Sequence, residues 1–225
     1  MGVAIVPAVT FLEPIRTAYN TVAESYHSML RDSLDDIPFY RAMIDAFGSV
    51  VSGAVADIGC GPGHLTAHLR GRGVDAFGID LTPGMIDVAR REYPGIRFEV
   101  GSMLALDLKD ESLGGILASY SIIHMPPTEY PAVFGEFHRV LAPGGHVLVA
   151  FHVGDRIRHL TQGYGHDIDL DVHWLRPDHI EALLQDAGLK VIARLVQEHE
   201  LPDKPQQAVL VAQRPPLMVN TDPTT

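Results

Sequence analysis

Apolar and polar residues alternate along the chain in two periods, one typical of buried strands and one typical of amphipathic helices. Short apolar runs that end in glycine, such as AVADIG at 54–59, predict strands buried on both faces. Stretches with apolar residues three and four apart predict helices. The predicted helices are 15–34, 38–48, 64–73, 83–93, 127–141 and 177–188, and the predicted strands are 54–59, 74–80, 96–101, 114–120, 146–153, 189–198 and 207–213.

The order of these elements predicts an α/β fold. Strands that alternate with helices form a parallel sheet with helices on both faces. The last two strands have no helix between them, and a short connection joins antiparallel neighbours. The sheet is therefore predicted to be parallel with one antiparallel edge element. Ligands of such sheets bind beyond the carboxyl ends of the strands. The turns at that edge follow residues 58, 80, 101, 120 and 152.

Composition and charge narrow the class of protein. The length of 225 residues predicts one domain, and 46% hydrophobic residues are enough to bury a core. The 28 acidic residues outnumber the 17 Lys and Arg residues, which gives a net charge of −11. This charge argues against nucleic acid and against an anionic membrane as a partner. A single cysteine, Cys60, excludes a disulfide framework and a cysteine-based zinc site.

The sequence predicts neither a membrane span nor a signal peptide. No apolar run approaches the ~20 residues that span a bilayer. The N-terminus lacks a basic segment and has prolines at positions 7 and 14, so we predict no signal peptide. The simplest compartment is the cytoplasm. No exposed apolar stripe in the pattern specifies an oligomeric state.

A glycine-rich turn over 57–63 follows one predicted strand and opens a helix. Its glycines allow a sharp turn and close approach of a ligand to the backbone. The dinucleotide fingerprint G-x-G-x-x-G/A fits poorly, because it places His64 at the last position. Asp57 would repel a pyrophosphate and attract an ammonium or sulfonium group. Asp80, at the end of the next strand, can accept the hydroxyls of a ribose, which both ligand classes carry.

Three motifs resemble those of class I S-adenosylmethionine-dependent methyltransferases: DIGCGPGHLTAHL, FGIDLTPGMIDVAR and FHRVLAPGGHVLVAF. The resemblance covers about 17–213 and is greatest to small bacterial members that methylate small molecules, including those of ubiquinone, menaquinone and natural-product pathways. It implies a Rossmann-like, seven-stranded, mostly parallel sheet with one antiparallel strand, helices on both faces and an N-terminal helical cap. It also implies a cap segment over 1–48 and a cofactor-binding domain over 49–214, within one domain overall. The proline-rich composition of 215–225 predicts a disordered tail.

The same resemblance implies a set of cofactor-binding residues. Asn20 and Ser102 stand where the family usually carries acids. Tyr19 and Tyr26 share one helix face, which is consistent either with a place over the cofactor or with helix packing. The implied cofactor is S-adenosylmethionine, with S-adenosylhomocysteine as its product. The implied cofactor-binding residues are Tyr19, Asp57, Gly59, Gly61, Gly63, Asp80, Leu81, Met85, Ser102, Met103 and Ser119.

Methyl transfer needs alignment of the reacting atoms more than it needs a fixed catalytic group. Positioning supplies about 7–11 kcal/mol of barrier reduction, and a base is needed only when the acceptor arrives protonated. His124, directly after the fourth strand, is a candidate general base, with a structural histidine as the alternative. The 154–176 segment lies where the family places substrate contacts. The candidate substrate-binding residues are Tyr26, Tyr120, His152, Tyr164, His166 and Trp174.

The acidic stretch within that segment also resembles a metal site. Asp167, Asp169 and Asp171 alternate, so they would share one face of a strand between His166 and His173. We favour a solvated edge strand over a metal cluster, since no HExxH or cysteine spacing supports a metal.

Three functions fit the sequence. The family members that methylate amines of bases or glutamine amides carry Asn/Asp-Pro-Pro-Tyr/Phe after the fourth strand, whereas 118–121 read Ala-Ser-Tyr-Ser here. We therefore favour transfer to an O or N acceptor on a small molecule in primary or secondary metabolism, with a carbon acceptor left open. The alternatives are a protein of the same fold that binds the cofactor without methyl transfer, such as a regulator, lyase or cyclase, and a nicotinamide-dependent oxidoreductase.

Overall fold

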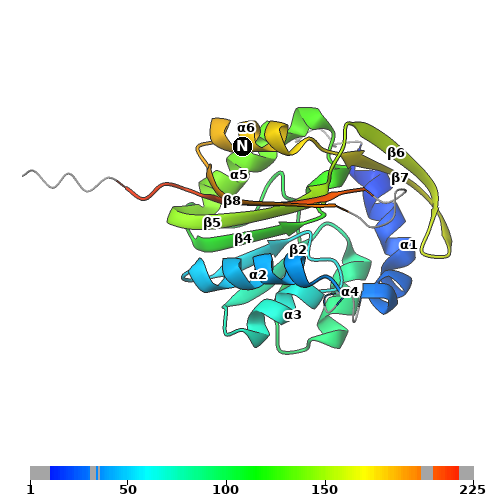
Figure 1. Cartoon of the computed structure of the whole chain (residues 1–225). Coiled ribbons are helices and arrows are strands. Elements are labelled where there is room, and N and C mark those ends of the chain that lie inside the picture. The colour runs from blue at the N-terminus through cyan, green and yellow to red at the C-terminus, as the bar shows by residue number, and fades with distance from the viewer. Residues whose placement is uncertain (1–10, 31–33, 35, 199–204, 218–225) are drawn as a thin grey trace, which may run out of the picture.

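A computed structural model describes residues 11–30, 34, 36–198 and 205–217 of the chain (Figure 1). The N-terminal stretch 1–10 that bears on a signal peptide, and most of the tail 215–225 that was predicted to be disordered, lie outside the described residues. No helix among the described residues is both long enough and apolar enough to cross a lipid bilayer.

The described residues build a seven-stranded sheet in the order β3-β2-β1-β4-β5-β9-β8. Strands β1 to β5 run parallel, and β9 runs antiparallel to both of its neighbours. The reversed strand therefore lies inside the sheet, where an antiparallel edge element had been expected. The burial of the two strands explains this order, because Ala208–Ala212 of β9 are buried while β8 is mostly solvent-exposed. The strands are β1 Val55–Ile58, β2 Ala76–Asp80, β3 Phe98–Val100, β4 Leu113–Ser119, β5 Leu141–His152, β8 Lys190–Gln197 and β9 Gln207–Gln213.

Helices cover both faces of the sheet, as the sequence predicted. In the view of Figure 1, α5 and α6 lie above the sheet, and α2 and α3 lie below it. Helix α2 packs on β5 and β9, whereas α1, which also belongs to the expected cap segment 1–48, lies across the carboxyl edge of the strands. The helices are α1 Leu12–Leu30, α2 Pro38–Val50, α3 His64–Gly71, α4 Pro83–Glu92, α5 Tyr130–Val140 and α6 Pro177–Asp186, with short 3₁₀ turns η1 Ile122–His124 and η2 Pro127–Glu129.

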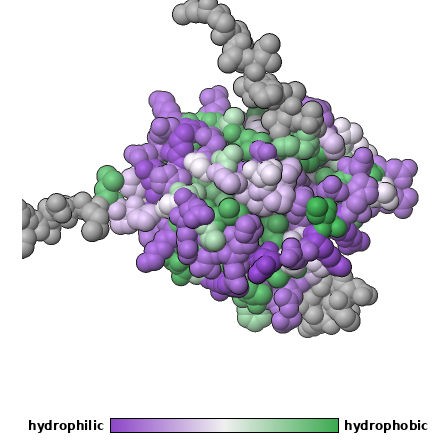
Figure 2. Space-filling model, turned by 90° about the horizontal axis from the view of Figure 1, so that it is seen from above, coloured by the Kyte–Doolittle hydropathy of each residue, from purple (hydrophilic) through white to green (hydrophobic). Residues whose placement is uncertain are grey.

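The core lies on both faces of the central strands. Every residue of β1 is buried, which explains why its sequence reads as a continuous apolar run. Phe134 and Phe137 of α5 fill one side, and Phe47 of α2 with Leu69 of α3 fills the other. Asp57 is the polar exception within β1 and is only 1% exposed, so its burial needs a separate explanation. Outside the core, Figure 2 shows a mostly polar face on which apolar residues are scattered.

A separate β-hairpin covers helix α1 on its outer side. Strands β6 Arg156–Gly163 and β7 His166–Trp174 pair antiparallel, and β7 packs against α1 (Figure 1). The two turn residues, Tyr164 and Gly165, both have positive φ, at 56° and 82°, which is the backbone of a tight hairpin turn. No hairpin was predicted here, because arginines and a histidine interrupt the apolar alternation of β6.

Candidate active site

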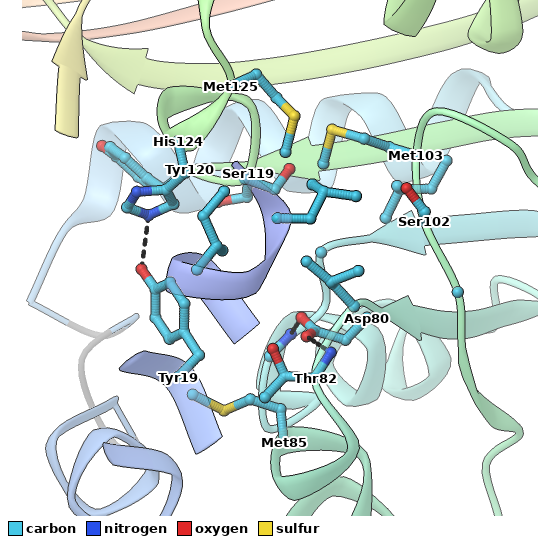
Figure 3. Close-up of a pocket in the computed structure, with 18 of the residues that line it drawn as sticks. Tyr19, Asp80, Thr82, Met85, Ser102, Met103, Ser119, Tyr120, His124 and Met125 are labelled. Carbon is cyan, nitrogen blue, oxygen red and sulfur yellow. Dashed lines mark hydrogen bonds between the residues drawn. The ribbon is translucent and has the colours of Figure 1, made fainter. Parts of the chain in front are cut away.

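Two adjoining cavities lie between α1 and the carboxyl ends of β1, β2 and β4. The first, close to β2, has a volume of about 650 Å³ including its open mouth, and the second has about 540 Å³. These volumes are typical of small-molecule sites. Figure 3 shows side chains of the first cavity, which come from α1, the strand ends and α4. The predicted residues that line it are Tyr19, Tyr26, Gly59, Gly61, Asp80, Leu81, Met85, Ser102, Met103, Ser119, Tyr120 and His124. Asp57 lines the second cavity, which shares Tyr26, Gly59, Gly61, Ser119 and Tyr120 with the first.

The glycine turn at the junction of the cavities depends on two glycines for different reasons. Gly59 has φ +75°, and a Cβ there would collide with the side chain of Ser121. Gly63 has φ +84° and caps α3, and a Cβ there would lie 2.6 Å from the Phe98 ring. Gly59 therefore keeps the backbone open toward the cavities. Gly63 lines neither cavity and packs away from them against β3, although it was predicted beside the cofactor.

The carboxylate of Asp80 organises the turn from the end of β2. One oxygen accepts the Gly61 N–H at 2.8 Å, and the other accepts the Thr82 N–H at 2.8 Å (Figure 3). Burial raises the pKa of Asp80, and these hydrogen bonds partly offset that effect. Each carboxylate oxygen keeps a lone pair for a further donor. Asp80 can therefore accept hydroxyl groups from a ligand in the cavity.

Asp57 lies deeper than Asp80, at the second cavity. It accepts a hydrogen bond of 2.6 Å from the hydroxyl of Thr66, which is itself buried in α3. Burial, reinforced by the negative charge of Asp80, raises the pKa of Asp57 to about 7. A cationic group in the second cavity would favour the ionised form of Asp57. The sequence analysis missed Thr66, whose signal was a hydroxyl on the buried face of α3.

Tyr19, His124 and the hairpin form one hydrogen-bonded chain. The Tyr19 hydroxyl lies 2.7 Å from His124 Nε2 (Figure 3), and on the other side of the ring His124 Nδ1 lies 2.9 Å from the carbonyl oxygen of Asp171 in β7. A carbonyl only accepts, so Nδ1 carries the proton and Nε2 accepts from Tyr19. Burial lowers the pKa of His124 to about 4, which keeps the ring neutral. The candidate base thus has its lone pair on the atom that faces Tyr19.

Aromatic and imidazole rings continue the wall from β4 toward the hairpin. The Tyr120 ring lies 4.9 Å from His152 and 6.0 Å from Tyr40, and His152 lies 6.4 Å from Trp174. Of these residues only Tyr120 lines the first cavity. Tyr40, which the sequence analysis missed, lines the second cavity and hydrogen-bonds to Ser119. Its place in an ordinary amphipathic helix gave no signal of this contact.

Two predicted substrate residues lie at the tip of the hairpin instead. The Tyr164 ring is 4.9 Å from Tyr26, and His166 Nε2 is 2.8 Å from the Ser25 hydroxyl. Neither Tyr164 nor His166 lines the two cavities. Both residues hold the hairpin against α1, so the structure places them behind the cavity wall.

Several buried polar atoms at the cavities have no hydrogen-bond partner among the described residues. They include the hydroxyls of Tyr120 and Ser121 and the Nδ1 atom of His64. Such atoms are rare in folded proteins, because each carries a desolvation cost. Ser121 lines the first cavity and His64 the second, so a polar ligand there could provide their partners. These atoms, the carboxylates and the open glycine turn fit a nucleoside with an amino-acid end.

The acidic face of the hairpin is present but carries no metal-like arrangement. His159 Nδ1 lies 2.8 Å from Asp171 Oδ1, and both side chains are more than half exposed. Nowhere in 11–30, 34, 36–198 and 205–217 do three or more His, Cys, Asp or Glu side chains gather as a metal site.

Comparison with known proteins agrees with this geometry. Residues 55–145 match the family described as "Methyltransferase domain". The chain is 31% identical over 110 residues to the demethylmenaquinone methyltransferase of Renibacterium salmoninarum. This aligned region covers 49% of this chain and 46% of that protein. It is 30% identical over 137 residues to the malonyl-[acyl-carrier protein] O-methyltransferase of Yersinia pestis, with coverages of 60% and 49%. The chain thus spans about half the length of these curated relatives.

Solved structures with low sequence identity share the fold. Magnesium protoporphyrin IX methyltransferase from Synechocystis PCC 6803 superposes with a TM-score of 0.71 at 16% identity, covering 92% of this chain and 99% of that one. The 1,6-didemethyltoxoflavin-N1-methyltransferase of Burkholderia thailandensis gives 0.67 at 18% identity, with coverages of 96% and 93%. The resemblance to class I S-adenosylmethionine-dependent methyltransferases and the predicted Rossmann-like fold are confirmed.

Proposed function

We propose that this protein transfers a methyl group from S-adenosylmethionine to a small molecule. The observation that carries the proposal is the pair of buried carboxylates, Asp57 and Asp80, on either side of an open glycine turn at two joined cavities. One cavity offers a carboxylate with free lone pairs to a ribose. The other offers a carboxylate to a cationic amino-acid end.

The remaining cavity residues suit an adenosine ligand. Leu81 and Met85 supply apolar contacts beside Asp80, and Ser102 with Met103 closes the end of the cavity next to β3. Ser119 is held by Tyr40 at the junction of the cavities, where the reacting sulfur belongs in this proposal. The predicted cofactor residues thus fall into one continuous wall, with Gly63 supporting the turn from behind.

When bound, the cofactor supplies an electrophilic methyl group on a sulfonium. The chain supplies position and exclusion of water, because α1 and the hairpin cover the carboxyl edge of the sheet. His124 stays the candidate general base of this proposal, with Nε2 as the atom that accepts the proton. An acceptor hydroxyl or amine would have to replace the Tyr19 hydroxyl at that atom. Without such a replacement His124 is a positioning residue that fixes Tyr19.

An O or N acceptor on a small metabolite fits the site best. The strand end at 118–121 lacks the Asn/Asp-Pro-Pro-Tyr/Phe pattern of methyltransferases that act on bases and amides. The similar proteins include a malonyl-[acyl-carrier protein] O-methyltransferase, a 1,6-didemethyltoxoflavin-N1-methyltransferase and a geranyl diphosphate C-methyltransferase, so they do not decide between the acceptor atoms. The net charge of −11 argues against nucleic acid as the acceptor.

A second candidate function is binding of the cofactor without methyl transfer. The hydrogen bond from Tyr19 to His124 Nε2 favours it, because the atom that would accept the acceptor's proton is already occupied in this arrangement. The [4+2]-cyclase SpnF also has this fold, with a TM-score of 0.60 at 18% identity over 78% of this chain and 81% of that one.

The test is calorimetric titration of the purified protein with S-adenosylhomocysteine, with NADH in parallel. The proposal predicts saturable binding of S-adenosylhomocysteine alone. Binding of NADH alone, or of neither ligand, contradicts it. Incubation with S-adenosylmethionine and a metabolite mixture then separates the two functions, because methyl transfer gives a product heavier by one methyl group and the second function gives none.

A further inference from the structure

Three arginines at the base of the β6–β7 hairpin have no acidic partner. Among the described residues, no ion pair or hydrogen bond involves the guanidinium of Arg156, Arg158 or Arg176. Many other arginines form ion pairs, as Arg139 does with Asp110 and Glu136. The chain has a large excess of acids, so a shortage of carboxylates does not explain the difference. The three guanidinium groups are therefore available to an anion from outside the chain.

Arg156 is also held in an orientation that suits recognition. Its guanidinium carbon lies 3.6 Å above the centroid of the Trp174 ring. Stacking on an aromatic face leaves the N–H groups free around the edge of the guanidinium plane. Trp174 also contacts His152, and His152 contacts Tyr120 at the first cavity. Ring contacts thus connect the cavity to Arg156 without a break.

Arg158 lies two residues further along β6, so its side chain leaves the strand on the same face as that of Arg156. Its positive charge acts on His152, where it adds to burial in lowering the pKa of the imidazole to about 4. His152 is therefore neutral, and its buried Nδ1 has no partner among the described residues. An anion between Arg158 and His152 would meet a positive charge and an unsatisfied ring nitrogen.

The surroundings of Arg156 are basic on the outer side as well. A groove of about 760 Å³ next to Trp174 is lined by Arg156, Arg176 and two histidines, with Asp155 as the acid of its wall. Elsewhere the chain carries a strong negative charge that repels anions. The hairpin base is thus a local region of positive potential on an acidic protein.

We propose that the methyl acceptor is a planar molecule with a carboxylate or another compact anionic group, which Arg156 and Arg158 hold while its ring lies along Tyr120, His152 and Trp174. This inference rests on the proposed function, because it names the acceptor class of that site. The arginines select and orient the acceptor, and the reacting atom lies at the other end of the ring, beside the first cavity.

Trp174 is the only tryptophan of the chain, so its fluorescence reports binding at this position directly. The full-length protein, saturated with S-adenosylhomocysteine, is titrated with 4-hydroxybenzoate and 4-hydroxybenzamide, 3-hydroxybenzoate and 3-hydroxybenzamide, and phenyl phosphate and phenol. We expect at least one anion to change the emission and to bind at least ten-fold more tightly than its neutral partner. Comparison of the two benzoates with phenyl phosphate shows whether the site prefers a carboxylate or a phosphate.

Arg156→Gln and Arg158→Gln should each weaken that anion at least ten-fold and leave its neutral partner unchanged. The matched control is Arg97→Gln, because Arg97 also stacks on an aromatic ring, 3.5 Å above Phe77, but lies at the opposite edge of the sheet. The control should bind the anion as the parent protein does.

Two results overturn the proposal. One is a panel in which no anion binds more tightly than its neutral partner, and the other is unchanged anion affinity in both arginine variants. Calorimetry with S-adenosylhomocysteine on the same samples separates this failure from failure of the proposed function. Retained cofactor-product binding without anion preference removes the acceptor class alone, whereas loss of that binding in the parent protein removes both.

Discussion

The two sides of the cavity pair are lined by different kinds of chemical group. The side formed by β1, β2 and the glycine turn is backbone and buried carboxylate, and its hydrogen bonds join residues close to the strand ends. The opposite side is rings and hydroxyls from α1, α2, η1 and the hairpin, in contact across large sequence separations. The sheet itself fixes the first side, which we call the rigid side. The second side, which we call the docked side, exists only while α1 and the hairpin are docked, so its residues can vary without disturbing the first.

In the proposed function, the rigid side provides most of the cofactor contacts, and the docked side, apart from Tyr19, selects the acceptor. Substitutions on the rigid side should change the affinity for S-adenosylhomocysteine. Substitutions on the docked side other than at Tyr19 should change rate, acceptor preference or local stability and leave that affinity nearly intact.

The largest effect is expected for Asp57→Ala. The substitution removes the buried carboxylate that, in the proposed function, faces the cationic end of the cofactor, and it leaves Thr66 without its partner. Loss of one partner of a buried charge pair costs about 3–5 kcal/mol, which corresponds to a loss of affinity of a hundred-fold or more. Calorimetry with S-adenosylhomocysteine measures it, and Thr66→Val is the matched control with the carboxylate retained. Affinity equal to that of the parent protein would remove Asp57 from the site.

His124→Ala should lower kcat by about a hundred-fold while the affinity for S-adenosylhomocysteine stays within a few-fold, because general bases contribute about 10²–10⁴ in rate. His124→Gln separates the two roles of this residue. Glutamine can accept a hydrogen bond from Tyr19 but cannot take a proton at neutral pH. A glutamine variant as slow as the alanine variant supports the base, and one with nearly full kcat supports positioning.

Acidification should destabilise the protein in part through His124. Burial holds its folded pKa at about 4, below the ordinary value near 6.5, so the unfolded state binds the proton more readily. The contribution of His124 to the free energy of unfolding is fully present above pH 6.5. It declines as the pH falls toward 4, by at most about 3 kcal/mol. Urea unfolding of the parent protein and His124→Gln at pH 7.5 and pH 4.5 measures it. A stability difference between the two that does not shrink at pH 4.5 would contradict the assignment.

The smallest effect is expected at the tip of the hairpin. The Ser25–His166 hydrogen bond ties β7 to α1 at a partly exposed position and should contribute about 0.5–1.5 kcal/mol. A double-mutant cycle of Ser25→Ala and His166→Ala in urea unfolding gives the coupling energy. His159→Ala, on the exposed face of the same hairpin, is the control and should show no coupling to Ser25. Additive single and double substitutions would show that the contact does not hold the hairpin.

The rigid side was predictable from sequence because each of its elements depends on residues that are close together in the chain. The turn over 57–63 and the acid at Asp80 are each set by a strand end, and parallel strands bring their carboxyl ends to one edge. Even here Gly63 was assigned to the ligand although it packs on Phe98, because spacing alone does not tell which way a turn residue faces.

The docked side was predictable only in part. His152 and Trp174 were expected near the acceptor, and ring contacts do join them to Tyr120. Tyr40, Thr66 and the covering of His124 Nε2 by Tyr19 depend on packing between segments that no short pattern connects. The position of β9 inside the sheet was missed for the same reason, since strand order follows burial across the whole sheet.

The most direct test of the account measures protons during cofactor-product binding. Calorimetric titration with S-adenosylhomocysteine at pH 7, in buffers of different ionisation enthalpy, gives the number of protons released. Because the pKa of Asp57 is raised to about 7, a cation bound beside it should displace about half a proton in the parent protein and none in Asp57→Asn. Binding with equal proton release in both proteins, or no binding to the parent protein, would contradict the account.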